Sequence, residues 1–186
     1  MEKDDDQLIK EYLDGNQDSF RLLIDKYTPS LYNFSIRFVG KDYANDIVQD
    51  AFIKIWRNIK KFDHKKANFK TWIFTITRNT ITDYLRKKKM INFSSLDKEE
   101  EKFEDSIEDE VILPDEALIK LEDKEFLNNT IDQIPNNYKE VLILYYQEEM
   151  TFSEIGKMLN KPLNTVKSYH YRALIILKKM LENKDY

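Results

Sequence analysis

The sequence has 186 residues, enough for one ordinary domain or two small ones, and its 41% hydrophobic residues provide material for packed cores. Three glycines and four prolines argue against a turn-rich β protein, and the lack of cysteine excludes disulfides, thiolate nucleophiles and cysteine-ligated zinc. The acidic start MEKDDDQLIK carries no secretory signal, and no apolar run approaches the roughly 18 residues of a membrane span. We therefore expect a soluble, cytoplasmic, mostly helical protein with no direct membrane insertion.

The net charge of −4 hides an uneven distribution. Residues 54–70 hold seven cations and one acid, 78–89 five and one, and 157–184 seven and one. By contrast, 90–116 holds eleven acids and two lysines, and the first 25 residues hold eight acids and three cations. Exposed charges are screened beyond about 10 Å at 0.1 M salt, so attraction for phosphate is decided locally. The sequence therefore predicts two basic regions, 54–89 and 157–184, separated by an acidic segment.

Apolar residues at helical spacing predict helices along the first ninety residues. A stripe from Leu8 to Tyr27 predicts a helix that ends before Pro29, followed by helices over 31–39 and 44–59. The core-facing side of the segment 44–59 is predicted to hold Ile47, Val48, Ala51, Phe52, Ile55 and Trp56. A further helix is predicted over 69–89, after a basic loop at 60–68. One flank of that helix is polar and basic, with Arg78, Asn79, Thr82, Arg86 and Lys89.

The acidic segment is the predicted domain boundary. Residues 92–114 show no sustained helical stripe, are dense in like charge and end at Pro114. We favour a solvated linker over a binding element here. Twenty-three residues reach at most roughly 78 Å when extended and about 26 Å on average as a flexible coil.

The segment after the linker predicts a helix–turn–helix. Helices are expected over 116–134, ending before Pro135, and over 138–146. Thr151 and Glu154 form a capping-box pattern that begins the next helix. Asn160 can adopt the left-handed conformation that ends it, and Pro162 suits the start of the last helix.

The last helix has one apolar and one polar side. Val166, Ala173, Leu174 and Leu177 are predicted to hold it against its neighbours. Facing outward, near its N-terminal half, are Asn164, Thr165, Lys167, Ser168, Tyr171 and Arg172. A recognition helix meets base edges in the DNA major groove at this end. The pattern is also consistent with a helical hairpin that has a solvated basic face.

Two stretches of the sequence resemble a known protein family. NDIVQDAFIKIWRNIKKF (45–62) with FKTWIFTITRNTITDYLRKKK (69–89) closely resembles region 2 of the extracytoplasmic-function (ECF) group of sigma-70-type RNA polymerase sigma factors. IPNNYKEVLILYYQEEMTFSEIGKMLNKPLNTVKSYHYRALIILKK (134–179) resembles region 4 of the same family. The resemblance implies an all-α fold of two small helical domains, region 2 at 1–91 and region 4 at 116–186, joined by an acidic flexible linker at 92–115.

Functional residues are carried over from this resemblance by position. The residues implied to bind the core polymerase are Asp46, Gln49, Asp50, Ile53 and Trp56. Those implied to read and open the −10 promoter element are Lys60, Lys61, Lys65, Lys66, Asn68, Arg78, Asn79, Arg86 and Lys87. Those implied to read the −35 element are Thr151, Ser153, Asn164, Thr165, Lys167, Ser168, Tyr171 and Arg172.

The resemblance also implies partners. Region 2 docks on the clamp helices of the largest polymerase subunit, region 4 lies on the flap, and both contact promoter DNA. An anti-sigma factor, in this family often membrane-bound, is a further implied partner, and no cofactor or enzymatic activity is implied. Tyr169 stands where the family often has arginine, and Asn164 replaces a frequent glycine. His170 takes a normally apolar position and is expected to be a packed histidine, while His64 lacks clustered ligands for a metal.

Two other interpretations compete with the sigma factor. A self-sufficient helix–turn–helix repressor or activator would bind a palindrome as a dimer. It leaves residues 45–89 without a role, and no dimerisation helix is apparent. An enzyme that acts on nucleic acid would need carboxylates or histidines at useful spacing, and we find no such constellation.

Overall fold

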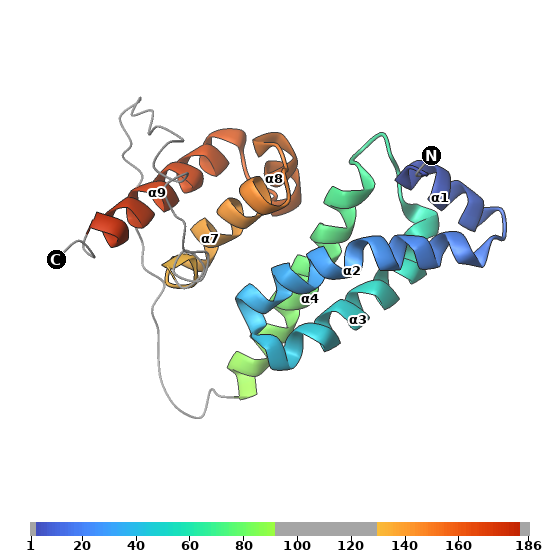
Figure 1. The fold of residues 1–186 in the computed structure, drawn as a ribbon, viewed down its shortest axis with the longest axis horizontal. Helices are drawn as coiled ribbons and strands as arrows, with labels where there is room; N and C mark the ends of the chain where they lie inside the picture. Colours follow the sequence, from blue (N-terminus) through green and yellow to red (C-terminus); the bar gives the residue numbers. More distant parts are fainter. Residues whose placement is uncertain (1–2, 92–129, 183–186) are drawn as a thin grey trace. The chain divides into compact units, whose positions relative to one another are not determined.

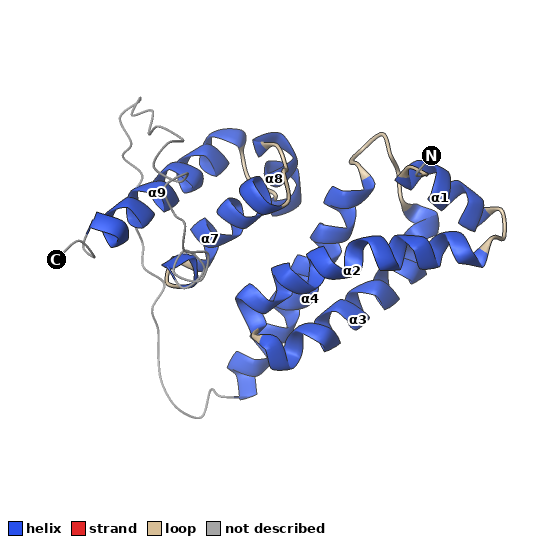
Figure 2. Cartoon of the chain, viewed as in Figure 1, coloured by secondary structure: helices blue, strands red, loops and turns tan. Residues whose placement is uncertain are grey.

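The computed structural model describes residues 3–91 and 130–182, and every regular element within these two ranges is helical. The chain divides into two compact units, Met1–Ser95 and Leu96–Tyr186. Figure 1 shows the described helices of both units, and Figure 2 shows the loops that join consecutive helices within each unit. The predicted acidic linker and most of the predicted helix at 116–134 lie outside the described residues.

Within residues 3–91, the first unit contains four α-helices, α1 (Asp5–Leu13), α2 (Gln17–Val39), α3 (Lys41–Asn58) and α4 (Phe69–Ile91). Helices α2, α3 and α4 pack against one another, and α1 packs on α2 (Figure 1). The side chains that fill the space between them include Leu23, Leu31, Phe34, Ile47, Ala51, Ile55, Ile73 and Phe74. This core holds α3 and α4 rigidly, so their outer faces are fixed surfaces.

The start of the first unit differs from the sequence prediction. The stripe from Leu8 to Tyr27 is broken at Gly15, whose φ of 108° is accessible to glycine and rarely to other residues. Helix α2 then continues through Pro29, where the sequence had predicted a helix end. That prediction was wrong. Proline lacks a backbone N–H, so the helix has one hydrogen bond fewer, but Pro29 is exposed and water can bond to the carbonyl left without a partner. The buried residues Tyr27 and Leu31 hold the helix together on either side.

The second unit begins, within the described residues, with a helical turn at 130–132 that ends before Pro135, as predicted. It continues with α7 (Asn136–Leu142), which runs into a π-helical turn, η2 (Ile143–Gln147). The helix–turn–helix follows as α8 (Phe152–Leu159) and α9 (Leu163–Glu182). One part of the core packs α7 against α9, through Leu142, Ala173 and Leu177, with Tyr138 and Leu174 partly buried beside them.

The local signals of the helix–turn–helix are confirmed. Thr151 Oγ1 accepts a hydrogen bond from the backbone N–H of Glu154, and a Glu154 carboxylate oxygen accepts one from the N–H of Thr151 at 2.8 Å. Asn160 ends α8 in the left-handed conformation, with φ 52° and ψ 48°. Pro162 directly precedes α9, and its carbonyl accepts the N–H of Val166. The turn therefore sets α9 at a defined angle to α8.

Candidate nucleic-acid interface

Helix α9 exposes a polar surface at its N-terminal half. Asn164 and Lys167 are exposed, and Thr165, Ser168, Tyr171 and Arg172 are half-buried. On the opposite side, Val166, Ala173 and Leu177 are buried. All six predicted outward residues therefore lie on the accessible side of one rigid helix. Amide, hydroxyl and cationic groups on such a face can donate hydrogen bonds to bases and phosphates.

Two of the α9 side chains on or beside this surface are held by Tyr138 of α7, a residue that the sequence analysis missed. Arg172 Nη1 donates to the hydroxyl of Tyr138 at 3.4 Å. The ring of Tyr169 meets the ring of Tyr138 edge-on at 5.3 Å between centroids, and Lys161 Nζ lies 5.8 Å from the Tyr169 centroid. Tyr169, where the family often has arginine, is thus engaged within the unit. Its ring braces the turn and the middle of α9.

His170 is packed among aromatic rings, as its position predicted. Its ring stacks on Tyr146 at 5.5 Å between centroids and meets Tyr145 and Phe152 edge-on at 5.0 and 5.1 Å. Its Nε2 lies 3.2 Å from the Tyr146 hydroxyl. Phe152 also stacks on Tyr145 at 4.6 Å. This cluster joins the π-helical turn, α8 and α9, and gives His170 a structural role.

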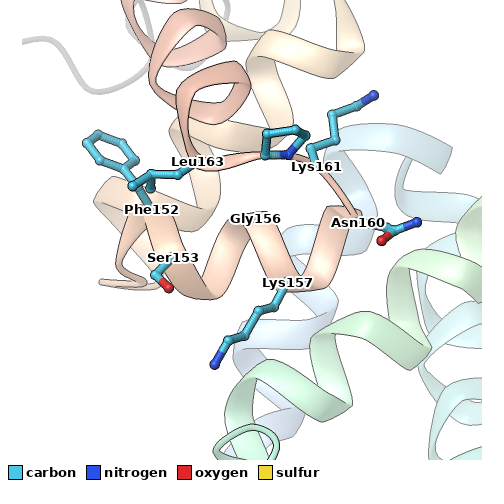
Figure 3. A pocket seen from close by; sticks show the side chains of 8 residues that line it. Phe152, Ser153, Gly156, Lys157, Asn160, Lys161 and Leu163 are labelled. Carbon is cyan, nitrogen blue, oxygen red and sulfur yellow. The ribbon is translucent and has the colours of Figure 1, made fainter.

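A shallow groove lies between α8 and the start of α9 (Figure 3). Its lining includes Ser153, Lys157, Asn160 and Lys161, all exposed. In Figure 3 the two lysines extend to different sides of the turn. Lys157 is a candidate that the sequence analysis left out, although Ser153, Lys157 and Asn160 have the spacing of one helix face. Such a polar face suits contact with a phosphate backbone.

Thr151, predicted to contact DNA, has a clear structural task as well. Its hydroxyl and its N–H both bond to Glu154 in the cap of α8. In the first unit, Asn68 is similar, because its Oδ1 accepts the N–H of Thr71 at 2.7 Å and caps α4. Capping was visible in the sequence for Thr151, whereas the cap at Asn68 was not noticed.

The polar flank of α4 lies beyond the basic loop. Asn79, Thr82, Arg86 and Lys87 are exposed and Arg78 is half-buried. Arg86 forms an ion pair with Asp83 at 2.9 Å. Asp83 also lies 4.0 Å from Lys54 Nζ, which in turn donates to Thr80 at 3.0 Å. Exposed pairs of this kind contribute little stability, so the guanidinium can exchange Asp83 for a phosphate at small cost.

The loop before α4 is cationic. It begins within η1 (Ile59–Lys61), a short 3-10 helix, and its exposed side chains are Lys60, Lys61, His64, Lys65, Lys66 and Asn68. The loop leads directly into α4, so the first unit exposes both the loop lysines and the α4 flank. Lysines on such a surface can track a nucleic-acid backbone, and amides can bond to bases.

Helix α3 exposes a different kind of surface. Asp46, Gln49, Asp50, Ile53 and Trp56 are all exposed and follow one side of the helix, with Ile53 40% and Trp56 53% accessible. The prediction that Trp56 lies in the core was wrong. The buried side here is formed by Ile55 and Ile59, and Trp56 lies outside it. Exposed tryptophan is typical of a protein–protein contact, because aromatic residues are enriched in such interfaces.

Two groups at contacts between helices have shifted pKa values. Burial raises the pKa of Tyr84, and the neighbouring Tyr43, with ring centroids 5.2 Å apart, adds to the shift. Hydrogen bonds from Lys3 and Ser19 lower the pKa of the Glu11 carboxyl. These groups mark the contacts between α3 and α4 and between α1 and α2. They provide no acid–base pair at the polar surfaces.

Within residues 3–91 and 130–182, no three potential ligands of the His, Cys, Asp or Glu type are placed to hold a metal ion. No helix in that part of the chain combines the length and the apolar character needed to cross a bilayer. The described residues thus form two helical units, and the second contains a helix–turn–helix with a polar, cationic side.

Comparisons with known proteins specify the family. The family model for sigma-70 region 2 matches residues 23–90, and the model for sigma-70 region 4 matches 127–177. ECF RNA polymerase sigma factor SigW of Bacillus subtilis is 36% identical, over 94% of this chain and 95% of its own. The ECF RNA polymerase sigma-E factor of Haemophilus influenzae is 27% identical, over 97% and 94%.

Two solved structures share the fold. CnrH, in complex with the cytosolic domain of CnrY, has a TM-score of 0.69 at 21% identity over 97% of this chain and 99% of its own. The sigma factor RpoE of Bartonella quintana, in complex with the anti-sigma factor NepR, has a TM-score of 0.68 at 22% identity over 90% and 98%. The chain belongs to the ECF group of sigma-70-type RNA polymerase sigma factors. Proteins of this family are transcription initiation factors, not enzymes.

Proposed function

We propose that this sigma factor brings core RNA polymerase to promoters by holding a −35 and a −10 element with its two units. The observation that carries the proposal is the pairing of two separate polar, cationic helical surfaces with the two family regions. The limits proposed for the parts are 1–91 for region 2, 92–115 for the linker and 116–186 for region 4.

The −35 element is assigned to the helix–turn–helix. The polar side of α9 carries the base-reading groups, and the start of α8 carries Thr151 and Ser153 against the backbone. Arg172, with its five donors in a planar fork, is suited to a guanine or a phosphate. Asn164 and Lys167, both exposed near the start of α9, add an amide and a cation. Support comes from their common face on a helix whose other side is buried.

The −10 element is assigned to the basic loop and the α4 flank. An opened strand exposes bases that lose their pairing partners, at a cost of a few kcal/mol per flipped base. The exposed amide of Asn79 can replace part of that pairing, and the loop lysines can hold the backbone. The opening is driven by binding energy and requires no nucleotide hydrolysis.

Polymerase contacts are assigned to the exposed stripe of α3, which would dock on the clamp helices, and to the second unit, which would lie on the flap. Elements about 25 base pairs apart are roughly 85 Å apart along B-DNA. A flexible linker that averages about 26 Å rarely spans that distance. Polymerase is therefore needed to hold the two units at that separation. The protein acts in the cytoplasm, where the polymerase and the chromosome are.

An anti-sigma factor is proposed as the regulatory partner. CnrH and RpoE were each solved with a bound protein, the cytosolic domain of CnrY and the anti-sigma factor NepR. Ile53 and Trp56 give such a partner an accessible apolar target on α3. Covering them would also block the proposed clamp contact, which is a direct way to keep the factor inactive.

The test is transcription by purified core polymerase on a promoter library, with and without this chain. Promoter-specific RNA that depends on the chain supports the proposal. Tight binding of the chain alone to a palindrome, with core polymerase left inactive, would instead identify a dimeric repressor or activator.

A further inference from the structure

The basic loop contains one acid. Between Lys54 and Lys70, Asp63 is the sole carboxylate among seven cations. Its side chain is 40% exposed, so its negative charge acts on a phosphate that approaches the loop. A carboxylate at this place repels the DNA backbone that the lysines attract. Its presence therefore requires another benefit.

Asp63 organises the turn of the loop. Its Oδ1 accepts the backbone N–H of Lys65 at 3.0 Å, the side-chain-closed turn that aspartate and asparagine favour. Its backbone carbonyl accepts the N–H groups of Lys66 at 3.0 Å and Ala67 at 3.5 Å. Lys66 Nζ lies 3.7 Å from the other carboxylate oxygen, but Lys66 is 83% exposed, so that ion pair is weak.

Both ends of the loop are anchored independently. At the start, the ring of Phe62 meets Phe69 at 5.4 Å and Trp72 at 5.3 Å between centroids. At the end, Asn68 caps α4 through Thr71. The span between these anchors contains Lys65 and Lys66, and its side-chain hydrogen bond comes from Asp63. Beside the backbone bonds to the Asp63 carbonyl, this side-chain oxygen therefore helps to set the shape of the middle of the loop.

We propose that Asp63 is a positioning residue for promoter opening, which sets the loop between Phe62 and Asn68 in its binding shape before DNA arrives. The inference rests on the proposed role of this loop at the −10 element. A loop that is already ordered loses less conformational entropy on binding, so the opened strand is held more tightly. The hydrogen-bonding oxygen provides this benefit, and the negative charge is its cost.

Two substitutions separate the oxygen from the charge. Asp63→Asn and Asp63→Ala remove the same charge and the same ion pair with Lys66. Asparagine keeps a carbonyl oxygen for the N–H of Lys65, whereas alanine does not. Serine, which closes such turns more weakly, provides an intermediate case in Asp63→Ser.

The experiment measures permanganate reactivity of the −10 element in complexes of the full chain with core polymerase, alongside protection of the −35 element. We expect Asp63→Asn to open the promoter at least as well as the natural protein. Asp63→Ala is expected to open it about fivefold less than Asp63→Asn, the effect of one lost hydrogen bond, with Asp63→Ser between them. Protection of the −35 element is expected to be the same in all variants, and the melting temperature of Asp63→Ala is expected to fall by no more than about 8 °C, the effect of one lost hydrogen bond on a unit of this size.

The outcomes are distinct. If the natural chain opens promoters and the alanine and asparagine variants behave alike, Asp63 does not act through its oxygen and the inference is overturned. If the alanine variant also loses −35 protection, or if its melting temperature falls by clearly more than about 8 °C, the role is structural, and the inference is again overturned. If the natural chain gives no promoter-specific opening with core polymerase, it is the proposed function itself that fails.

Discussion

Gly156 lies at the closest approach within the helix–turn–helix. A Cβ atom at this position would lie 2.9 Å from the backbone oxygen of Lys161 and 3.7 Å from Val166 Cγ2. The N–H of Lys161 donates to the carbonyl of Gly156 at 2.9 Å, so the turn cannot move away without losing that bond. Gly156→Ala therefore forces the end of α8 and the turn apart.

The magnitude follows from two opposing effects. Alanine gains about 1 kcal/mol over glycine inside a helix. Overpacking a close contact costs about 1–3 kcal/mol, and the upper end applies because the atom that must move belongs to the backbone. The second unit is then destabilised by about 2 kcal/mol, which raises its opening equilibrium roughly thirtyfold.

Native-state hydrogen exchange measures this directly. The amides of Ile155 and Val166 are hydrogen-bonded in α8 and α9, and we expect both to exchange about thirtyfold faster in the variant. Trp56 and Trp72 both belong to the first unit, so their fluorescence during unfolding serves as an internal control. Ser153→Ala, at an exposed site of the same helix, is the matched substitution. Exchange in Gly156→Ala at or below the natural rate would refute the reasoning.

Three further predictions concern the proposed contacts. Trp56→Ala is expected to fold normally and to weaken association with core polymerase about thirtyfold, the loss of a 2 kcal/mol interface anchor. Titration against core polymerase checks this, with the exposed Leu22→Ala on α2 as control, and equal losses in both would contradict it. Asn79→Ala is expected to reduce permanganate reactivity at −10 several-fold with −35 protection intact, and unchanged opening would count against the proposed role. Arg172→Ala is expected to lower protection of the −35 element in footprinting about tenfold. Tyr138→Phe removes only the supporting hydroxyl and is expected to have a smaller effect. A larger effect of Tyr138→Phe would place Arg172 in a structural role.

Local signals in the sequence predicted the helix–turn–helix closely. The capping pair Thr151 and Glu154, the left-handed Asn160 and the proline before α9 each act over a few residues, so their chemistry can be recognised without knowledge of the fold. The packing of His170 was likewise expected, because the family normally has an apolar residue at that position. The family regions added the assignment of surfaces to partners.

Features that depend on tertiary packing were predicted less well. Pro29 is tolerated within α2 because buried side chains on both sides hold the helix, which a local rule cannot weigh. Trp56 has the spacing of a core residue, yet it lies at the edge of the apolar stripe and is exposed. The contact of Tyr138 with Arg172 joins residues 34 positions apart, and no pattern along the chain signals it.

The most direct test of the account is a combined footprint of one promoter with the chain alone, with core polymerase alone, and with both. The account predicts protection of the −35 and −10 elements, with permanganate-reactive bases at −10, only when both proteins are present. Protection of both elements by the chain alone, or the same opening by core polymerase alone, would contradict it.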